Sequence, residues 1–163
     1  MNNNLIITIG REYGTGGREI GQKLALRLGV PFYDRELITR AAKKTGFDEK
    51  LFEQLDKRAT NSFLYSLTMF GSVGLNGMSL TDQLAQSNII REMAEDSSCV
   101  IVGRCADHVL RDFPNKFDFF IHGSIEDRVK RVQTCGDYVI EGKTPEAALE
   151  KMDKQRSTYY NYY

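Results

Sequence analysis

The chain has 163 residues, which is enough for one ordinary domain with its own hydrophobic core. Its 22 basic and 22 acidic residues balance, and this argues against capture of nucleic acid or a membrane surface, since both need clustered positive charge. A small anionic ligand needs only a few local arginines and stays compatible with this balance. Three cysteines, Cys99, Cys105 and Cys135, form no CxxC pair and indicate reduced thiols in a cytoplasmic protein without a zinc or iron site. The polar start and the short apolar runs give no signal peptide or membrane span.

Residues 5–28 predict a strand, a glycine-rich turn and a helix. The strand covers 5–9, the turn contains Gly14, Gly16 and Gly17, and a helical spacing of apolar residues follows up to a stop at Gly29. This order points backbone N–H groups and the positive end of a helix dipole at a phosphate. The segment 11–18 is therefore interpreted as a phosphate-binding turn, with a plain strand-to-helix connection as the alternative.

The turn satisfies neither of the two common phosphate-binding motifs. The pattern G-x-x-x-x-G-K-[S/T] fails in both registers, because Arg11 replaces the first glycine in one, and Arg18 and Glu19 replace the lysine and hydroxyl in the other. The dinucleotide pattern G-x-G-x-x-G fits Gly14 and Gly16 but fails at Glu19. This mismatch argues against a nicotinamide-dependent oxidoreductase, even though Asp34 lies at a suitable distance along the chain.

The rest of the chain alternates between strand-like and helix-like patterns. Strands are expected at 30–34, 99–102 and 117–121, and helices at 34–46, 48–58, 81–95, 124–135 and from 144 onward. Thr81 or Asp82, Ser124 and Thr144 are the expected starts of the last three helices, with Asp127 pairing Ser124. Segment 59–80 mixes polar and apolar residues; a loop of this length is usually functional or mobile, and its apolar residues leave a partner or dimer surface open. The alternation predicts an α/β sandwich with a parallel sheet and helices on both faces.

Four segments resemble the cytidylate kinase-like family, a divergent branch of the nucleoside monophosphate kinases. They are ITIGREYGTGGREIG, PFYDRELI, the run Gly103-Arg104-Cys105-Ala106-Asp107 and the run Asp153-Lys154-Gln155-Arg156. The resemblance implies a P-loop kinase fold in one domain, 1–163, with an acceptor-binding insertion at 47–92 and a lid at 136–145. It also implies that segment 59–80 closes over the acceptor. The family core normally continues beyond the point where this chain stops, so we expect the C-terminal strand to be missing.

The resemblance also implies a set of site residues, with ATP and Mg²⁺ as cofactors and a nucleoside monophosphate as acceptor. The residues expected at the donor phosphates are Arg11, Gly14, Thr15, Gly16, Gly17 and Arg18. Those expected at the acceptor are Asp34, Arg40 and Arg104, and those expected in catalysis are Arg18, Asp153 and Arg156. Arg18 is the proposed substitute for the absent lysine, since it is the only cation at either lysine register. Cys105 replaces the carboxylate that selects cytosine in the family, so the base preference stays open.

Several interpretations remain open at this stage. Arg128 and Arg131 could supply the lid charge that Leu149 lacks, although a solvated helix face is the preferred interpretation for both. The four tyrosines of the last five residues either stack on a base or, preferably, pack the missing C-terminal strand. A nucleotide-binding sensor or partner protein with little catalysis is the main alternative to a kinase, and a homodimer is possible.

Overall fold

The computed structural model describes residues 3–35, 37–38, 80–135, 138 and 144–161. The expected helix at 48–58 and the expected insertion up to residue 79 lie outside these residues. The described helices and strands are, in chain order, β1 (Ile6–Arg11), α1 (Gly17–Leu28), β2 (Phe32–Tyr33), α5 (Leu80–Asp96), β3 (Cys99–Val102), α6 (Ala106–Val109), β4 (Lys116–Ile121), α7 (Ile125–Thr134) and α8 (Pro145–Asn161).

The four described strands form one parallel sheet in the order β2-β3-β1-β4. In the register of this sheet, Ile9 of β1 lies beside Val102 of β3 and Phe119 of β4. Because all neighbours are parallel, the carboxyl ends of the strands meet at one edge, which is where ligands bind in open α/β sheets. Arg11, Asp34 and the segment after Val102 therefore belong to the same edge.

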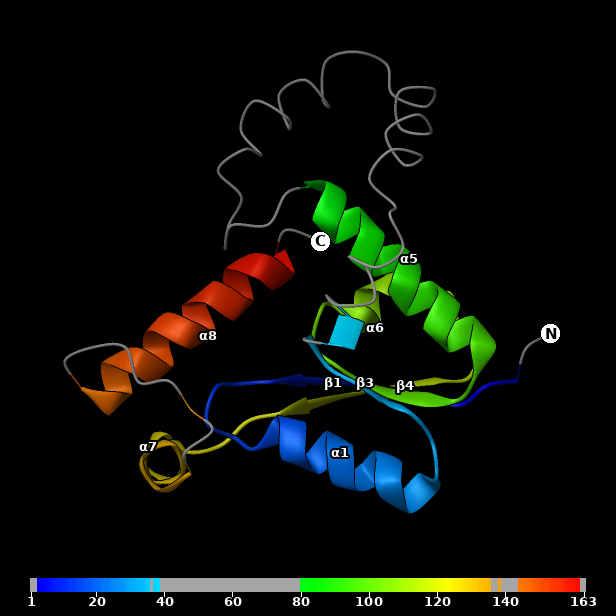
Figure 1. Ribbon diagram of the computed structural model, residues 1–163. Helices are drawn as coiled ribbons and strands as arrows, with labels where there is room; N and C mark the ends of the chain where they lie inside the picture. The colour runs from blue at the N-terminus through cyan, green and yellow to red at the C-terminus, as the bar shows by residue number, and fades with distance from the viewer. Residues whose placement is uncertain (1–2, 36, 39–79, 136–137, 139–143, 162–163) are drawn as a thin grey trace, which may run out of the picture.

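Helices cover both faces of the sheet, as the alternating pattern predicted. On one face α1 packs on Ile7, Ile9, Val100 and Val102, and on the other α5 and α6 pack on Ile6, Cys99 and Ile101 (Figure 1). The contact with α1 is close because it is made at Gly21. A Cβ at this position would lie 2.6 Å from Val102 Cγ2, so only glycine lets the helix lie this near the strands.

Helices α7 and α8 lie beside the carboxyl ends of the strands rather than over a face (Figure 1). A third apolar cluster joins them to the turn after β1, with Tyr13 packed against Val132 of α7 and Leu149 of α8. The ring of Tyr13 also meets that of Tyr138 edge-on, at a centroid distance of 5.3 Å. This packing brings residues of α8 to the sheet edge, although they follow the turn by about 140 positions in sequence.

Most of the expected element bounds are confirmed within one or two residues. Strand β3 has the expected limits, and β4 begins one residue earlier than expected. The capping prediction at Ser124 is confirmed, because its Oγ accepts from the Asp127 N–H at 3.1 Å. The prediction that Thr81 or Asp82 caps α5 is wrong: the helix already begins at Leu80, and helix ends are the part of a helix that a sequence pattern locates least well. The missing C-terminal strand and the division at 47–92 and 136–145 stay predictions.

Candidate active site

The turn between β1 and α1 depends on two glycines in the left-handed conformation. Gly14 has φ 82° and Gly16 has φ 76°, a region that costs other residues about 1–2 kcal/mol. Gly14 also has no room for a side chain, since a Cβ would lie 2.9 Å from Val132 Cγ2 and 3.1 Å from Leu149 Cδ2. Gly16 is the N-cap of α1, where no side chain caps the helix. The N–H groups of the first turn therefore face the bend in the chain, as they do in anion-binding helix starts.

The remaining residues of the predicted phosphate turn shape its backbone. The Thr15 hydroxyl donates to the carbonyl oxygen of Glu12 at 2.9 Å and so closes the turn internally. Gly17 lies against the side chain of Arg11, because a Cβ on this glycine would come within 2.8 Å of Arg11 Cβ. The Arg11 side chain can thus leave β1 beneath the start of α1.

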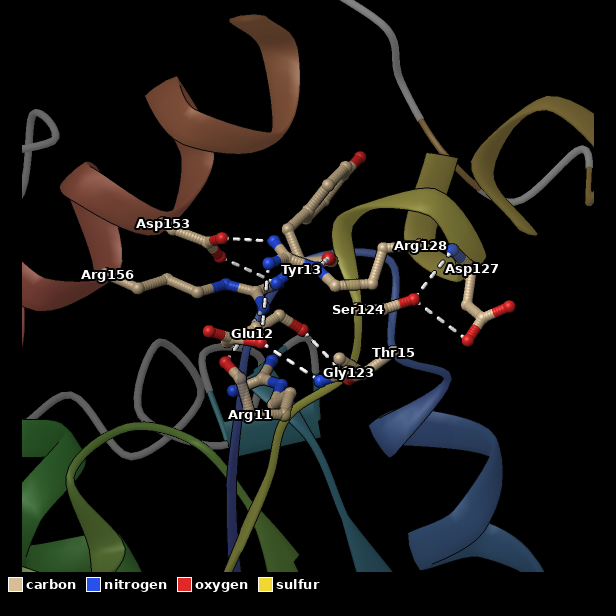
Figure 2. Close-up of polar contacts among 10 residues, drawn as sticks. All are labelled: Arg11, Glu12, Tyr13, Thr15, Gly123, Ser124, Asp127, Arg128, Asp153 and Arg156. Carbon is tan, nitrogen blue, oxygen red and sulfur yellow. Dashed lines mark hydrogen bonds and ion pairs between the residues drawn. The ribbon is translucent and has the colours of Figure 1, made fainter. Parts of the chain in front are cut away.

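Arg128 of α7 fixes the turn from the outside (Figure 2). Its side chain is only 8% exposed, and its Nε donates to the Tyr13 carbonyl oxygen at 2.8 Å. The same guanidinium forms ion pairs with Asp153 and, at 3.3 Å, with Glu12. Each carboxylate holds a backbone N–H as well: Asp153 accepts from Tyr13 at 2.7 Å and Glu12 from Gly123 at 3.1 Å. One buried cation therefore links the turn, the end of β4, and helices α7 and α8.

The preferred interpretation of Arg128 as part of a solvated helix face is wrong. Its position on α7 turns it toward the cluster of Tyr13, Val132 and Leu149, and the two carboxylates make its burial favourable. The hydrogen bonds of Asp153 are those of a residue that positions the turn, and its catalytic assignment stays a prediction. The sequence alone could not predict the ion pair between Glu12 and Arg128, because the two residues are 116 positions apart and no spacing pattern links them.

We expect Arg128→Met to destabilise the protein by about 2–3 kcal/mol, since two carboxylates would be left facing each other without a cation. This value lies below the roughly 3–5 kcal/mol for a fully buried pair because both carboxylates reach water. Chemical denaturation measures the change, and Lys130→Met, an exposed position on the same helix, is the control. Equal midpoints for the two variants would show that the ion pairs do not hold the turn.

Three arginines converge at the same edge of the sheet. Arg11 is partly buried, and its desolvation, followed by the charges of Arg156 and Arg104, lowers its pKa to about 10 against the smaller opposing effect of Asp34. Arg156 donates to the Arg11 carbonyl oxygen at 3.1 Å and lies over the Tyr13 ring at 5.1 Å. Burial also lowers the pKa of Arg156, although Asp153 opposes the change. The edge thus holds positive charge that an anion would stabilise.

Arg104 lies in a left-handed turn that follows β3. Gly103, Arg104 and Cys105 have φ values of 81°, 59° and 50°, so two residues with side chains occupy a conformation that favours glycine. The Arg11 guanidinium packs directly on Gly103, where a Cβ would collide with it. Arg104 in turn lies over the ring of Tyr159 of α8, 5.7 Å from its centroid. The turn thus carries Arg104 on the backbone against which Arg11 packs, and strain of this kind is concentrated at functional sites.

We expect Arg104→Gly to be more stable than Arg104→Ala by about 1 kcal/mol, because glycine adopts the left-handed backbone at no steric cost. The same pair of substitutions at Lys130 in α7 should show the opposite order by about 1 kcal/mol, since glycine weakens a helix interior. Thermal unfolding of the four variants measures both differences. The same order at both positions would contradict a left-handed constraint at Arg104.

Asp34 caps the helix that follows it and pairs with Arg18, while its expected role at the acceptor stays a prediction. Its Oδ1 accepts from the Leu37 N–H at 3.1 Å, as a helix cap does, and its Oδ2 pairs with Arg18 Nε at 2.8 Å. Asp34 is buried while the Arg18 side chain is 61% exposed. Arg18 therefore points toward the second strand rather than over the turn, and its role as the substitute for the lysine stays a prediction. Arg40 lies outside the described residues.

After Gly103, the Cys105 side chain is uncharged and the Asp107 carboxylate is hydrogen-bonded to another residue. Burial raises the pKa of the Cys105 thiol to about 12, so the group at the base-selecting position stays protonated. Asp107, two residues later, accepts from the Tyr160 hydroxyl at 2.6 Å, and this bond raises the pKa of Tyr160 to about 12. Tyr159 and Tyr160 of α8 therefore contact Arg104 and Asp107, and packing of the tyrosines against a C-terminal strand stays a prediction.

The described carboxylates around the turn do not by themselves form a Mg²⁺ site. Each pairs with a basic side chain: Glu12 and Asp153 with Arg128, Glu19 with Lys23 and Arg131, and Asp34 with Arg18. Within the described ranges no three His, Cys, Asp or Glu residues are grouped to hold a metal ion. A left-handed glycine turn with convergent arginines fits phosphate groups instead.

Solved structures of P-loop kinases share this fold. Shikimate kinase from Bacteroides thetaiotaomicron is 17% identical with a TM-score of 0.54, covering 96% of this chain and 82% of its own. Shikimate kinase from Acinetobacter baumannii, in complex with shikimate, is 15% identical with a TM-score of 0.51, covering 99% and 80%. The protein therefore has the α/β fold of the P-loop kinases.

The chain belongs to the cytidylate kinase-like family, whose model matches residues 6–163. An uncharacterised protein from Eubacterium ventriosum has a similar crystal structure, with 32% identity and a TM-score of 0.68 over 98% of this chain and 79% of its own. Among curated proteins, none matches this chain. None of the helices described is long and apolar enough to cross a membrane.

Proposed function

We propose that the protein transfers a phosphoryl group from ATP to a small phosphorylated acceptor, with a nucleoside monophosphate as the leading candidate. The observation that carries this proposal is the convergence of Arg11, Arg104 and Arg156 beside the glycine turn at the carboxyl edge of the sheet. Phosphoryl transfer needs positioning and positive charge around the reacting oxygens more than any other chemistry. These partly buried arginines supply this charge.

The donor triphosphate would lie on the turn 11–18, with its phosphates at the left-handed glycines and the start of α1. Arg11 and Arg156 would neutralise the phosphoryl group in transfer, because Arg156 is hydrogen-bonded to the Arg11 carbonyl oxygen at the end of β1. Arg18 could join them only by leaving Asp34. Mg²⁺ would arrive with the nucleotide, which holds this ion largely through its own phosphate oxygens and water.

The acceptor phosphate would contact Arg104 and, by the resemblance to cytidylate kinases, Arg40 and Asp34. We infer that the base is selected weakly, because the Cys105 thiol is buried and neutral where the family places a carboxylate. The substrate named for the Acinetobacter structure, shikimate, belongs to that protein, and the fold alone does not transfer it to this chain.

A nucleotide-binding protein with little catalysis is the second candidate. It is favoured by the absence of a lysine in both registers of the turn, a loss that typically removes several kcal/mol of transition-state stabilisation unless another cation replaces it. The arginines on the acceptor side favour the kinase, because a protein that only binds ATP has no use for them.

Isothermal titration tests the proposal with a non-hydrolysable ATP analogue and then with CMP, dCMP, UMP and AMP. Arg11→Met should lower the affinity for the ATP analogue, and Arg104→Ala should lower the affinity for the monophosphate. Each loss should be about one to two powers of ten, since a charge-assisted contact is worth roughly 1.5–3 kcal/mol. Arg11→Met should not lower the melting temperature of the free protein, because it removes a partly desolvated charge that Arg156 and Arg104 repel. The control is Arg27→Met, an exposed position at the far end of α1.

Analogue binding without any monophosphate binding would replace the kinase with the nucleotide-binding protein. No binding of the analogue would reject both candidates. Equal affinities in wild type and Arg11→Met would move the donor site away from the end of β1.

A further inference from the structure

Arg131 of α7 reaches over the glycine turn from the side opposite the arginine group at Arg11. Its guanidinium lies against Gly16, since a Cβ on this glycine would be 2.7 Å from Arg131 Cζ and 2.8 Å from its Nε. Gly16 is the N-cap of α1, so this cation stands directly before the uncapped start of the helix. By contrast, the Arg18 guanidinium points toward Asp34.

A carboxylate holds Arg131 in this position. Arg131 forms an ion pair with Glu19 in the first turn of α1, and its Nε makes a long hydrogen bond of 3.4 Å to the Tyr138 hydroxyl. Glu19 has a second partner one helical turn further on, Lys23, at 2.6 Å. The bond to Lys23 and, secondarily, that to Arg131 lower the pKa of Glu19, so the group stays ionised. Glu19 thus places a negative charge where a phosphate would approach the helix.

A phosphate can replace Glu19 as the partner of Arg131. The side chains are 49% and 34% exposed, and an ion pair between exposed groups contributes little to stability because water screens it. A triphosphate carries more negative charge than a carboxylate and presents several oxygens to a guanidinium, so it binds the same arginine more strongly. Lys23 remains with Glu19 when Arg131 leaves, so the carboxylate is not left without a cation.

We propose that Arg131 is a further donor-phosphate-binding residue and that Glu19 is an internal carboxylate which occupies Arg131 until the phosphate arrives. This inference rests on the proposed function, because it concerns the same turn. It accounts for two features that the function alone leaves unexplained: an acidic residue at the position of the usual hydroxyl, and an arginine of α7 that lies against Gly16. Nucleotide binding and the contact between α1 and α7 are then coupled.

The test measures binding of ATP and of inorganic tripolyphosphate to wild type, Glu19→Gln, Arg131→Met and the double variant. Arg131→Met should lower the affinity for both ligands about tenfold, which is the effect of losing one charge-assisted contact. Glu19→Gln should tighten both by about two- to fivefold, because it removes a competitor of the strength of an exposed ion pair. This gain should shrink in the Arg131→Met background, where no cation is released. Glu126→Gln, an exposed carboxylate in the first turn of α7, is the control and should change neither affinity.

A purely structural link between α1 and α7 gives the opposite result, because Glu19→Gln would then lower the melting temperature and leave affinity equal or weaker. Either that outcome or unchanged binding in Arg131→Met overturns the inference while the proposed function stands. If neither ATP nor tripolyphosphate binds the wild type, the proposed function and the inference both fail. Thermal unfolding of each variant confirms that a lost affinity is not a lost fold.

Discussion

The buried guanidinium of Arg128 is the interaction on which the geometry of this site depends. It binds the Tyr13 carbonyl oxygen and both Glu12 and Asp153, and these carboxylates hold the N–H groups of Tyr13 and Gly123. A buried charge is stable only when its partners are fixed around it, so the turn after β1 and the helices α7 and α8 constrain one another. The conformation of the glycine turn is thus set by residues from the other end of the chain.

Arg11 differs from Arg128 in how its charge is balanced. Arg128 is balanced by two carboxylates, whereas for Arg11 the repulsion from Arg156 and Arg104 outweighs the attraction of Asp34. Such a group adds little to the stability of the fold, and an anion bound beside it would complete the charge balance. The left-handed backbone of Arg104 and Cys105 points the same way, because strain is retained where function requires a particular geometry.

The sequence predicted the strands and helices that have strong periodicity and the sheet edge at which the ligand would bind. Residues 99–102, for example, form a continuous apolar run, and this run is a buried strand. The sequence could not predict that Arg128 is buried, because its partners Glu12 and Asp153 are distant in sequence. Only the packing of α7 and α8 brings them together. Nor could the sequence reveal the left-handed turn at Arg104, since neither arginine nor cysteine favours that conformation. The identity of the family came from motifs, whereas the charge balance around Arg11 came from the structure.

The central claim is that this concentration of positive charge serves phosphoryl transfer rather than nucleotide binding alone. The direct measurement follows the label from γ-³²P-ATP with Mg²⁺, the protein and each of the four monophosphates CMP, dCMP, UMP and AMP. The account predicts that at least one labelled nucleoside diphosphate forms, at a rate proportional to protein concentration. If bound ATP leaves all four monophosphates unlabelled, the arginines at the sheet edge do not carry out transfer to a nucleotide, and the account is contradicted.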